Sequence, residues 1–321
     1  MALHLVTGGA GFIGSHIAEE LLRQGEKVRI LDNLSTGKRE NVEALKGSVE
    51  FVEADICDDA AVRRAIAGCE VVFHEAAIPS VPRSIDDPLM TNRASVDGTL
   101  QLLMAAREAH VRRLIYASSS AVYGDTPMLP KVESMPTIPI SPYGVAKLTA
   151  EHYCRVFTIC YGFETVSLRY FNVFGPRQDP KSMYAGVIPI FVRELLKGNV
   201  PTIFGNGEQT RDFTYVANVV QLNLKAATAP KAAGGVFNGG AGGQVSLNEL
   251  YRLITRILGV SKPPAYVAER PGDILHSFAD IAAAQQVIGY NPQMSVEDGL
   301  KVTVEWLKTV PGIAAQPRRG R

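Results

Sequence analysis

The stretch LHLVTGGAGFIGSHIAEELLRQG, residues 3–25, decides the fold. A short apolar run (3–7) leads into a glycine-rich turn, and a helical pattern follows directly. Gly9, Gly11 and Gly14 match G-x-G-x-x-G, and Gly8 precedes them. Such a turn needs small residues because it is tight, its backbone must approach a pyrophosphate, and the helix N-terminus supplies N–H donors. We predict a dinucleotide-binding turn; the alternative is a glycine-rich turn that binds nothing.

Acidic residues end the next two apolar runs. Asp32 closes the run 27–32 and lies 18 residues after Gly14. An acid at this point accepts the two ribose hydroxyls and repels a 2′-phosphate, which favours NAD over NADP. Asp55 closes the third run, 49–55, where it could either bind the adenine amine or cap a helix that begins near Asp58.

Strand-like runs continue to alternate with helix-like segments through the first half of the chain, which predicts an α/β fold with a Rossmann-type, doubly wound parallel sheet. The long helical segments lie near 89–109 and 142–161. After residue 172 glycine and proline become frequent, and shorter helical pieces recur at 187–197, 246–258 and 296–308. We predict an NAD-binding domain at 1–172 with a returning segment near 212–238, a smaller α/β substrate lobe at 173–310, and a disordered tail at 311–321.

The composition narrows the function. The 321 residues carry 33 basic and 32 acidic side chains, a net charge of +1, so nucleic acid is not expected as a partner. The four cysteines form no CxxC pair and no histidine cluster accompanies them, so neither a metal site nor a disulfide framework is expected. No apolar run approaches the roughly 18 residues of a membrane-spanning helix, and the N-terminus predicts a first strand rather than a signal peptide. We therefore expect a cytoplasmic enzyme.

The stretch SPYGVAK, residues 141–147, predicts catalytic chemistry. Ser141 suits an N-cap and Pro142 the first helical position. Tyr143 and Lys147 are four residues apart and share one face of the helix. A free tyrosine has a pKa of about 10, but a nearby ammonium and the positive nicotinamide of NAD favour the phenolate. Tyr143 is then an acid/base and Lys147 its electrostatic partner, also able to hold the nicotinamide ribose; the alternative is a partly buried tyrosine beside a solvated lysine.

The serines of SSSAVYG, residues 118–124, strengthen this interpretation. They end the predicted fifth strand, at the edge where open α/β sheets place ligands. A hydroxyl there can bond a substrate oxygen and hold it against Tyr143. The alternative is turn or cap chemistry at a strand end.

Together, these and other motifs resemble the extended short-chain dehydrogenase/reductase family, and within it the nucleotide-sugar 4-epimerases that act on UDP-galactose and UDP-N-acetylglucosamine. The resemblance covers residues 1 to about 310. The motifs that carry it are TGGAGFIG (7–14), DNLSTG (32–37), HEAA (74–77), SSSAVYG, SPYGVAK, LRYFNVFGPRQ (168–178), TRDFTYV (210–216) and RPGD (270–273).

The resemblance implies a catalytic set of Ser119, Tyr143 and Lys147. Ser120 is a helper or the alternative serine, because this chain is one residue shorter than most such epimerases between the serines and VYG. It also implies a tightly bound NAD that is regenerated in each turnover. In that family Asn92 would pack behind the active site and Tyr170 would lie near the nicotinamide. The complete cofactor set is Gly8, Gly11, Phe12, Ile13, Gly14, Asp32, Asn33, Asp55, Ile56, Ala76, Asn92, Tyr143, Lys147 and Tyr170.

The resemblance also implies how a UDP-sugar would be held. Asn172 would bond the sugar diphosphate, and Arg211 and Arg270 would clamp it. Asp273 would meet the uridine ribose, and Phe204 the uracil. Alternatively, Arg211 and Asp212 could be a structural pair, and Phe204 a core residue. The complete substrate set is Ser119, Tyr143, Asn172, Val187, Phe204, Arg211, Arg270, Asp273, Ser277 and Arg83.

The implied reaction is inversion at C4 of a UDP-hexose through a 4-keto intermediate. Related dehydratases and decarboxylases carry acids beside the catalytic serine or threonine, whereas this chain has Ser120 and Ala121, which cannot ionise. A non-catalytic NAD-binding protein would be expected to lack the tyrosine or the lysine. We therefore rank both classes below an epimerase.

Substrate choice depends on two residues. In the family the residue seven positions after the clamp arginine lines the sugar pocket; here it is Ser277, whose small size would admit an N-acetyl group. This favours UDP-GlcNAc/UDP-GalNAc alongside UDP-Glc/UDP-Gal. Arg83 keeps an alternative open, because it could face a C6 carboxylate and select UDP-glucuronate or UDP-N-acetylglucosaminuronate; it could also contact the diphosphate or solvent.

Relatives in the family pair two long helices of each subunit into a four-helix bundle, so a homodimer is expected through 89–109 and 142–161. Apolar positions there, such as Leu100, Leu103, Met104 and Phe157, could instead belong to the core of one chain.

Overall fold

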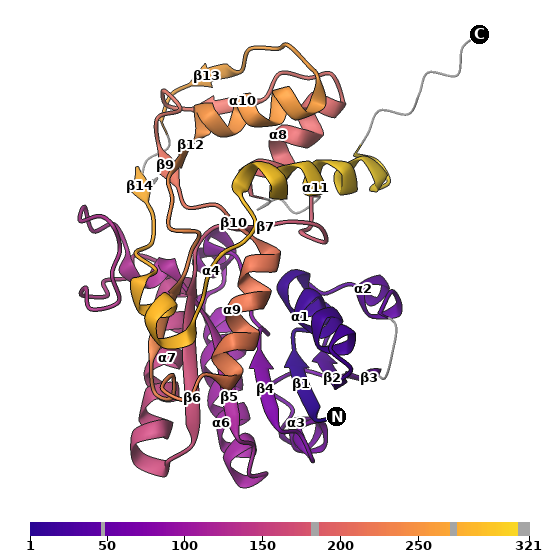
Figure 1. The fold of residues 1–321 in the computed structure, drawn as a ribbon, viewed down its shortest axis with the longest axis vertical. Coiled ribbons are helices and arrows are strands. Elements are labelled where there is room, and N and C mark those ends of the chain that lie inside the picture. The colour runs from indigo at the N-terminus through magenta and orange to yellow at the C-terminus, as the bar shows by residue number, and fades with distance from the viewer. Residues whose placement is uncertain (46–48, 181–185, 270–274, 314–321) are drawn as a thin grey trace.

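The computed structural model describes residues 1–45, 49–180, 186–269 and 275–313. A seven-stranded, all-parallel sheet forms its centre, in the order β11-β6-β5-β4-β1-β2-β3 (Figure 1). The predicted fold class is confirmed. The strands are β1 Leu3–Thr7, β2 Lys27–Asp32, β3 Val49–Glu53, β4 Val71–His74, β5 Arg113–Ser119, β6 Glu164–Tyr170 and β11 Val236–Gly239.

Helices cover both faces of this sheet because successive side chains of a buried parallel strand point to opposite sides. Val6 and Ile30 pack on the side of α1 (Phe12–Arg23) and α9 (Val216–Thr228). Leu5 and Leu31 pack on the opposite side. The helices of that side are α3 Asp59–Ile66, α6 Gly98–Glu108 and α7 Pro142–Tyr161.

The strand order reverses beside β1, which lies between β4 and β2. The chain runs from β1 to one neighbour through α1 and later reaches the other, so the loops after β1 and β4 diverge and leave a crevice at their carboxyl ends. The short helices α2 Arg39–Glu43, α4 Val81–Asp86 and α5 Pro88–Asn92 also belong to this region.

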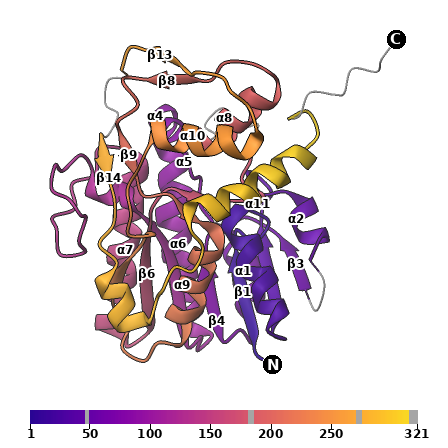
Figure 2. The same cartoon turned by 45° about the horizontal axis from the view of Figure 1, so that its top comes forward.

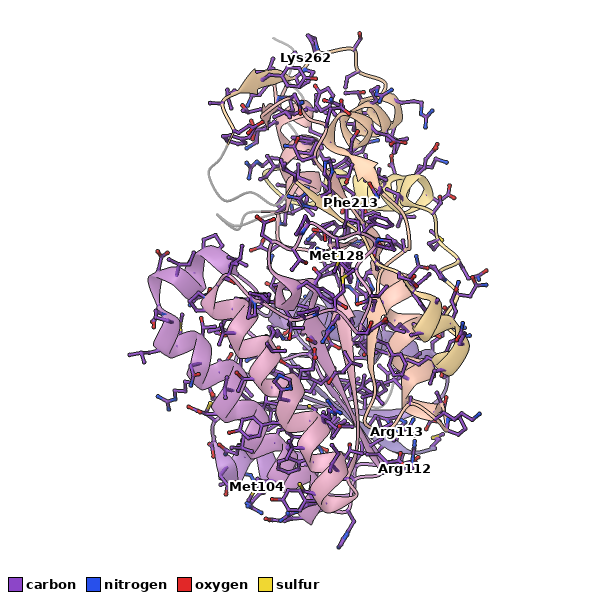
Figure 3. All side chains as sticks on the ribbon, turned by 90° about the vertical axis from the view of Figure 1, so that its left-hand side faces the viewer. Met104, Arg112, Arg113, Met128, Phe213 and Lys262 are labelled. Atoms are coloured by element: carbon purple, nitrogen blue, oxygen red, sulfur yellow. The ribbon has the colours of Figure 1, made fainter. Side chains whose placement is uncertain are left out.

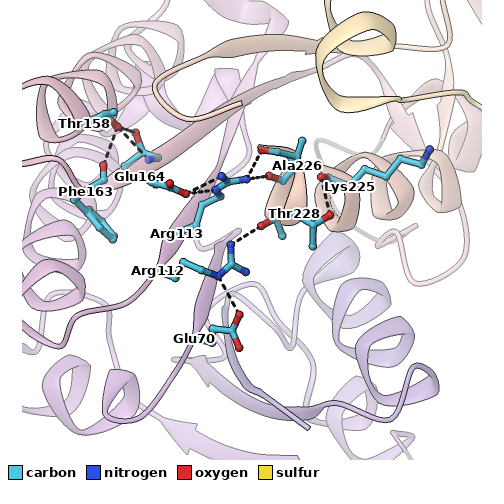
Figure 4. A network of polar contacts seen from close by, with 12 residues as sticks. Glu70, Arg112, Arg113, Thr158, Phe163, Glu164, Lys225, Ala226 and Thr228 are labelled. Carbon is cyan, nitrogen blue, oxygen red and sulfur yellow. Dashed lines mark hydrogen bonds and ion pairs between the residues drawn. The ribbon is translucent and has the colours of Figure 1, made fainter. Parts of the chain in front are cut away.

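The chain returns to the sheet through α9 and β11, and a polar network fixes this return (Figure 4). Arg113, at the start of β5, donates to the carbonyls of Ala226 and Ala229 at the end of α9, at 2.7 and 2.8 Å, and pairs with Glu164. Arg112 donates to Ala227 O at 3.0 Å. The arginines bond the last carbonyls of α9, which have no partner within the helix.

A smaller lobe stands above the carboxyl ends of the strands (Figures 1 and 2). Its helices share a core with Phe174, Ile203 and Phe213. They are α8 Val187–Leu196, α10 Leu247–Leu258 and α11 Val296–Thr309, close to the predicted ranges. Its strands are β7 Val173–Phe174, β8 Thr202–Phe204, β9 Thr210–Arg211, β10 Thr214–Tyr215, β12 Val245–Ser246, β13 Ala265–Val267 and β14 His276–Ser277. The division into a cofactor domain and a substrate lobe stays a prediction.

Two details refine the sequence predictions. The long helical segment near 89–109 consists of α5, a π-helical turn (Arg93–Asp97) and α6. The predicted disordered tail begins too early, because Ile313 is 1% exposed and packs in the core of the small lobe; residues 314–321 lie outside the described residues. Within the described ranges, no helix is long and apolar enough to cross a membrane.

Candidate active site

The turn between β1 and α1 depends on close backbone contacts. Gly8 has φ +68°, and a Cβ there would lie 2.7 Å from Ala76 N. A Cβ on Gly14 would lie 2.3 Å from Gly8 O, so only glycine lets the helix start this close to the strand. Gly11 is the N-cap of α1 and no side chain caps the helix, which leaves its first N–H groups for an anion. These features fit the pyrophosphate of a dinucleotide.

Asp32 lies at the end of β2 in a position that fits a ribose. Its carboxylate accepts hydrogen bonds from Ala10 N at 3.0 Å and Leu34 N at 2.8 Å. Burial raises its pKa, and these two bonds oppose that effect. Each carboxylate oxygen can accept more than one hydrogen, so capacity remains for the ribose hydroxyls. Gly37 keeps the approach open, since a Cβ there would lie 2.8 Å from both carboxylate oxygens.

Asp58, not Asp55, caps the next helix: its side chain accepts from Ala61 N at 3.0 Å at the start of α3. Asp55 instead accepts from Asn33 Nδ2 at 2.7 Å and Cys57 N at 2.8 Å, and lines the cleft. The sequence allows Asp55 either to bind the adenine amine or to cap the helix. The cap is Asp58, so the adenine amine is the role that is left for Asp55.

These residues share one cleft of about 1090 Å³ at the carboxyl edge of the sheet. It also receives the predicted catalytic tyrosine and serines. The predicted site residues that line it are Gly8, Gly11, Phe12, Ile13, Gly14, Asp32, Asn33, Asp55, Ile56, Ala76, Arg83, Ser119, Ser120, Tyr143, Tyr170 and Asn172.

Tyr143 lies in the first turn of α7, which two side chains cap. Ser141 accepts from Gly144 N at 3.1 Å, which confirms the predicted N-cap. Ser84, on α4, accepts from Tyr143 N at 3.1 Å. Ser84 is fully buried, so it ties the catalytic turn to the segment that carries Arg83.

Lys147 lies one turn later and is buried, 3% exposed, so the alternative of a solvated lysine is wrong. Its ammonium donates to Ala117 O at 2.6 Å and lies 5.9 Å from the centre of the Tyr143 ring. Burial lowers the pKa of Lys147 to about 8, and the negative charge of Glu75 opposes this. Burial raises the pKa of Tyr143, and a hydrogen bond with Ser119 opposes that increase.

The three serines at the end of β5 differ in their partners. Ser118 donates to Glu151 Oε2 at 2.9 Å, within a buried pair of Glu151 and Arg169. Ser119 bonds Tyr143 and also accepts from Ala121 N at 3.2 Å, so it combines the catalytic contact with a cap. Ser120 begins the following 3₁₀ turn and faces the cleft. This geometry favours Ser119 as the main serine.

The remaining substrate residues that the structure describes lie in the small lobe. Arg211 and Ser277 are neighbours across β9 and β14, and Phe204 ends β8. Arg211 donates to Thr210 O at 2.8 Å and Leu275 O at 3.2 Å. Val187 begins α8 and packs on the lobe's core. Arg270 and Asp273 lie outside the described residues.

Asp212 has a structural role beside Arg211. Its carboxylate accepts from the backbone N–H groups of Ala241, Gly242 and Ala279 at 2.7, 3.0 and 3.2 Å. It thereby joins β9 to the segments that follow β11 and β14.

The prediction for Asn92 is wrong. Asn92 ends α5, is exposed and does not line the cleft. The π-helical turn after it adds a residue to the turn and brings Ser95 inward instead. Ser95 is 2% exposed, and its carbonyl accepts from Thr99 Oγ1 at 2.6 Å. Thr99 also contacts His74 at 2.8 Å, so Ser95, rather than Asn92, is linked through Thr99 to the end of β4.

The sequence interpretation also missed several charged residues that line the cleft, among them Glu75 and Arg177. Glu75 directly follows a strand of four buried residues, a signal that could have identified it. Arg177 has φ +66°, pairs with Glu19 at 2.7 Å and donates to Ser15 Oγ at 3.3 Å, which holds the segment after β7 against α1.

Comparison with known proteins agrees with this geometry. The model of the NAD dependent epimerase/dehydratase family matches residues 4–240. The chain belongs to this family. A UDP-glucose 4-epimerase of Mycolicibacterium smegmatis is 41% identical over 95% of this chain and 98% of the relative.

Two solved structures are similar over nearly the whole chain. A UDP-N-acetylglucosamine 4-epimerase from Methanobrevibacter ruminantium, in complex with UDP-N-acetylmuramic acid, has a TM-score of 0.90 and 41% identity, covering 95% of this chain and 97% of that one. A UDP-glucose 4-epimerase from Thermotoga maritima, with UDP-glucose, has a TM-score of 0.90 and 40% identity, covering 95% and 98%.

We expect Ser119→Ala to lower kcat roughly 100-fold, because it removes the hydroxyl that bonds Tyr143. Ser120→Ala is the matched control and should lower kcat less than about tenfold. Steady-state epimerisation rates of the two variants measure this. A larger loss in Ser120→Ala would transfer the catalytic role to Ser120.

Proposed function

We propose that this protein is an NAD-dependent UDP-sugar 4-epimerase, an isomerase. The observation that carries the proposal is the position of Tyr143: it bonds Ser119, lies one turn from the buried Lys147, and lines the cleft that ends at Asp32. The similarity to UDP-sugar 4-epimerases over 95% of the chain supports the substrate class.

The chain's own residues supply binding and proton transfer. Ser119 and Tyr143 hold the 4-hydroxyl of the sugar, and Tyr143 as phenolate takes its proton. Lys147 stabilises the phenolate and holds the nicotinamide ribose. NAD, held by the turn at Gly8–Gly14 and by Asp32, would supply a reversible hydride acceptor for C4 of the sugar. Because the reaction oxidises nothing overall, the cleft should keep NAD bound throughout turnover.

The UDP-sugar extends from this cleft toward the small lobe. We assign Asn172 to the diphosphate, with Arg211 and Arg270 as its cationic clamp. We assign Asp273 to the uridine ribose, and Phe204 and Val187 to the base side of the site. Asn172 supports this assignment by its place on the cleft, where its backbone turns at φ +27°.

Other reactions of the family need groups that this site lacks. A dehydratase or decarboxylase would place an acid beside the catalytic serine, where this chain has Ser120 and Ala121. A non-catalytic binding protein would have no need for an ammonium buried beside Tyr143, because burying a charge costs stability. Both classes therefore rank below the epimerase.

Substrate choice follows from the neighbours of the diphosphate clamp. Ser277 pairs with Arg211 in the small sheet, and its small side chain favours an N-acetyl group at C2 of the sugar. We therefore propose UDP-GlcNAc/UDP-GalNAc, with UDP-Glc/UDP-Gal as further substrates. Arg83 lines the cleft, and this placement keeps UDP-glucuronate or its N-acetyl analogue as the second candidate.

We also propose a homodimer. Exposed apolar side chains lie on α4, α5, α6 and α7, and Figure 3 labels one of them, Met104. Leu103 and Phe157 belong to the chain's own core, at 0% and 3% exposed. A four-helix bundle with a second copy would cover the exposed ones. These are Ile85, Leu89, Met104, Val145, Val156 and Ile159, exposed by 39% to 82%.

We expect purified protein, without added NAD, to convert UDP-GlcNAc and UDP-Glc to their galacto epimers. Proton NMR of the anomeric signals, with UDP-glucuronate in parallel, measures this. Tyr143→Phe should lower the rate about 1000-fold, because the acid/base is removed. Tyr153→Phe, on the same helix, is the control and should remain active. An active Tyr143→Phe variant contradicts the role of Tyr143 as acid/base. If none of the three sugars is converted, the proposed substrates are wrong.

Ser277→Tyr should disfavour N-acetylated sugars. The tyrosine ring would fill the space near C2 of the sugar. The ratio of kcat/KM for UDP-GlcNAc to kcat/KM for UDP-Glc should therefore fall about 10- to 100-fold. His276→Tyr is the control, because successive residues of a strand point to opposite faces. The gate hypothesis fails if the ratio of the two substrates is unchanged in Ser277→Tyr.

Sedimentation at micromolar concentration should show a dimer. Ile159→Lys should yield monomers, because it places a charge in the apolar surface of α7. Val302→Lys, on α11 of the small lobe, is the control and should stay dimeric. A monomeric wild-type protein would rule out the association.

A further inference from the structure

Glu75 is an ionisable residue in the catalytic centre to which the reaction described above assigns no task. It directly follows β4, whose four residues are all buried. Its side chain opens into the cleft, as do those of Ser119, Tyr143 and Tyr170. A carboxyl group enclosed in this way costs stability, so its presence at the reacting end of the cleft calls for a chemical reason.

A directed chain of hydrogen bonds holds the carboxyl group. The amide nitrogen of Asn223 donates one hydrogen to Val219 O at 2.8 Å and the other to Tyr170 Oη at 2.7 Å. Tyr170 therefore keeps its own hydrogen for an acceptor. The nearer acceptor is Glu75 Oε1 at 2.8 Å, and the other is Asn223 Oδ1 at 3.1 Å. The chain ends on an acceptor oxygen, which suits an ionised carboxylate.

The groups that face Glu75 make Lys147 its natural counter-charge. Tyr116 on β5 and Tyr170 on β6 are neutral at ordinary pH because burial raises the pKa of each. Burial also raises the pKa of Tyr143, so its phenolate depends on a positive charge nearby. His74, its neighbour on β4, is also neutral, because burial lowers its pKa to about 3. From α9 it meets the uncharged amide of Asn223 through Tyr170. The cation whose charge favours the Glu75 carboxylate is Lys147, one turn after Tyr143 on α7.

We propose that Glu75 is a positioning residue of the epimerase: its carboxylate keeps Lys147 charged, so that the ammonium can stabilise the Tyr143 phenolate. The inference rests on the proposed function. Lys147 can assist Tyr143 only while it carries its proton, and burial works against that proton. The direct repulsion between Glu75 and the phenolate is the smaller cost, because the carboxylate bonds Tyr170 rather than Tyr143.

The two pKa shifts define the pH range concerned. Burial raises the pKa of Glu75 to about 7, so the carboxylate is present above that pH. The pKa of Lys147 is about 8 with Glu75 nearby, so the ammonium is present below that pH. The opposite charges therefore coexist between about pH 7 and 8. Without the carboxylate, Lys147 should lose its proton at lower pH.

The test is Glu75→Gln against Glu75→Asp in the holoenzyme. Glutamine still accepts from Tyr170 but carries no charge, whereas aspartate keeps the charge on a shorter side chain. In Glu75→Gln the alkaline limb of the kcat/KM profile should move down by about one pH unit, and in Glu75→Asp it should stay near its wild-type position. Glu133→Gln is the control, because Glu133 bonds Asn238 N at 2.7 Å, outside the cleft.

A second readout does not depend on turnover. In holoenzyme labelled with ¹³C-lysine, the Lys147 signal, assigned with Lys147→Arg, should titrate at lower pH in Glu75→Gln than in wild type. If the protein epimerises none of the sugars, this titration still tests the link between the two residues. Unchanged Lys147 titration, or superimposable pH profiles, would overturn the proposal.

If Glu75→Gln does not fold, Tyr170→Phe carries the test. It removes the hydrogen bond that stabilises the carboxylate, so the pKa of Glu75 should rise further and Lys147 should again titrate at lower pH. A Lys147 titration that stays at its wild-type position in this variant would overturn the proposal.

Discussion

The contact between Gly14 and the carbonyl of Gly8 is the constraint on which the rest of the structure depends. No other residue permits α1 to begin so close to the end of β1, since a Cβ would lie 2.3 Å from that oxygen. The contact places the helix N-terminus at the edge of the sheet where the strand order reverses. An anion-binding helix end and a crevice thus arise from one piece of backbone packing, and Asp32, Tyr143 and Ser119 converge on it from three other elements.

The catalytic pair depends on a second convergence. Helix α7 begins under two caps, one from its own Ser141 and one from Ser84 on α4. The first cap fixes where the helix starts, and the second fixes where its first turn lies relative to the cleft. Lys147 is then carried into the protein interior, where burial lowers its pKa to about 8 and makes its charge sensitive to its neighbours. A lysine on the surface would keep its proton but could not respond in this way.

The sequence was sufficient to predict what local patterns encode. Alternating apolar runs predicted the parallel sheet, the glycine spacing predicted the turn, and Ser141 and Pro142 predicted the start of α7. Predictions failed where the outcome depended on packing at a distance. The π-helical turn, invisible in residue periodicity, exposes Asn92 and buries Ser95. The sequence alone left open whether Asp55 caps α3 or faces the cofactor, because this depends on backbone geometry. The burial of Ile313 depended on the core of a distant lobe. Glu75 was missed because the role proposed for it depends on Lys147, which lies 72 positions later in the sequence.

The two halves of the site differ in how firmly they are built. The proton-transfer residues stand on β5, which lies between β4 and β6 in the central sheet, and on α7, which packs along one face of that sheet. Of the residues assigned to the UDP-sugar, Phe204, Arg211 and Ser277 stand on strands of two or three residues. The carboxylate of Asp212 joins β9 to its neighbours by accepting from backbone N–H groups. A sugar whose C4 must present both faces to one fixed cofactor needs room to turn, while its acid/base must stay in place. The catalytic residues lie at the edge of the large sheet, and the residues assigned to the diphosphate lie in the small lobe with its short strands. This arrangement meets both needs, because different parts of the chain carry the reacting groups and the anchor of the diphosphate.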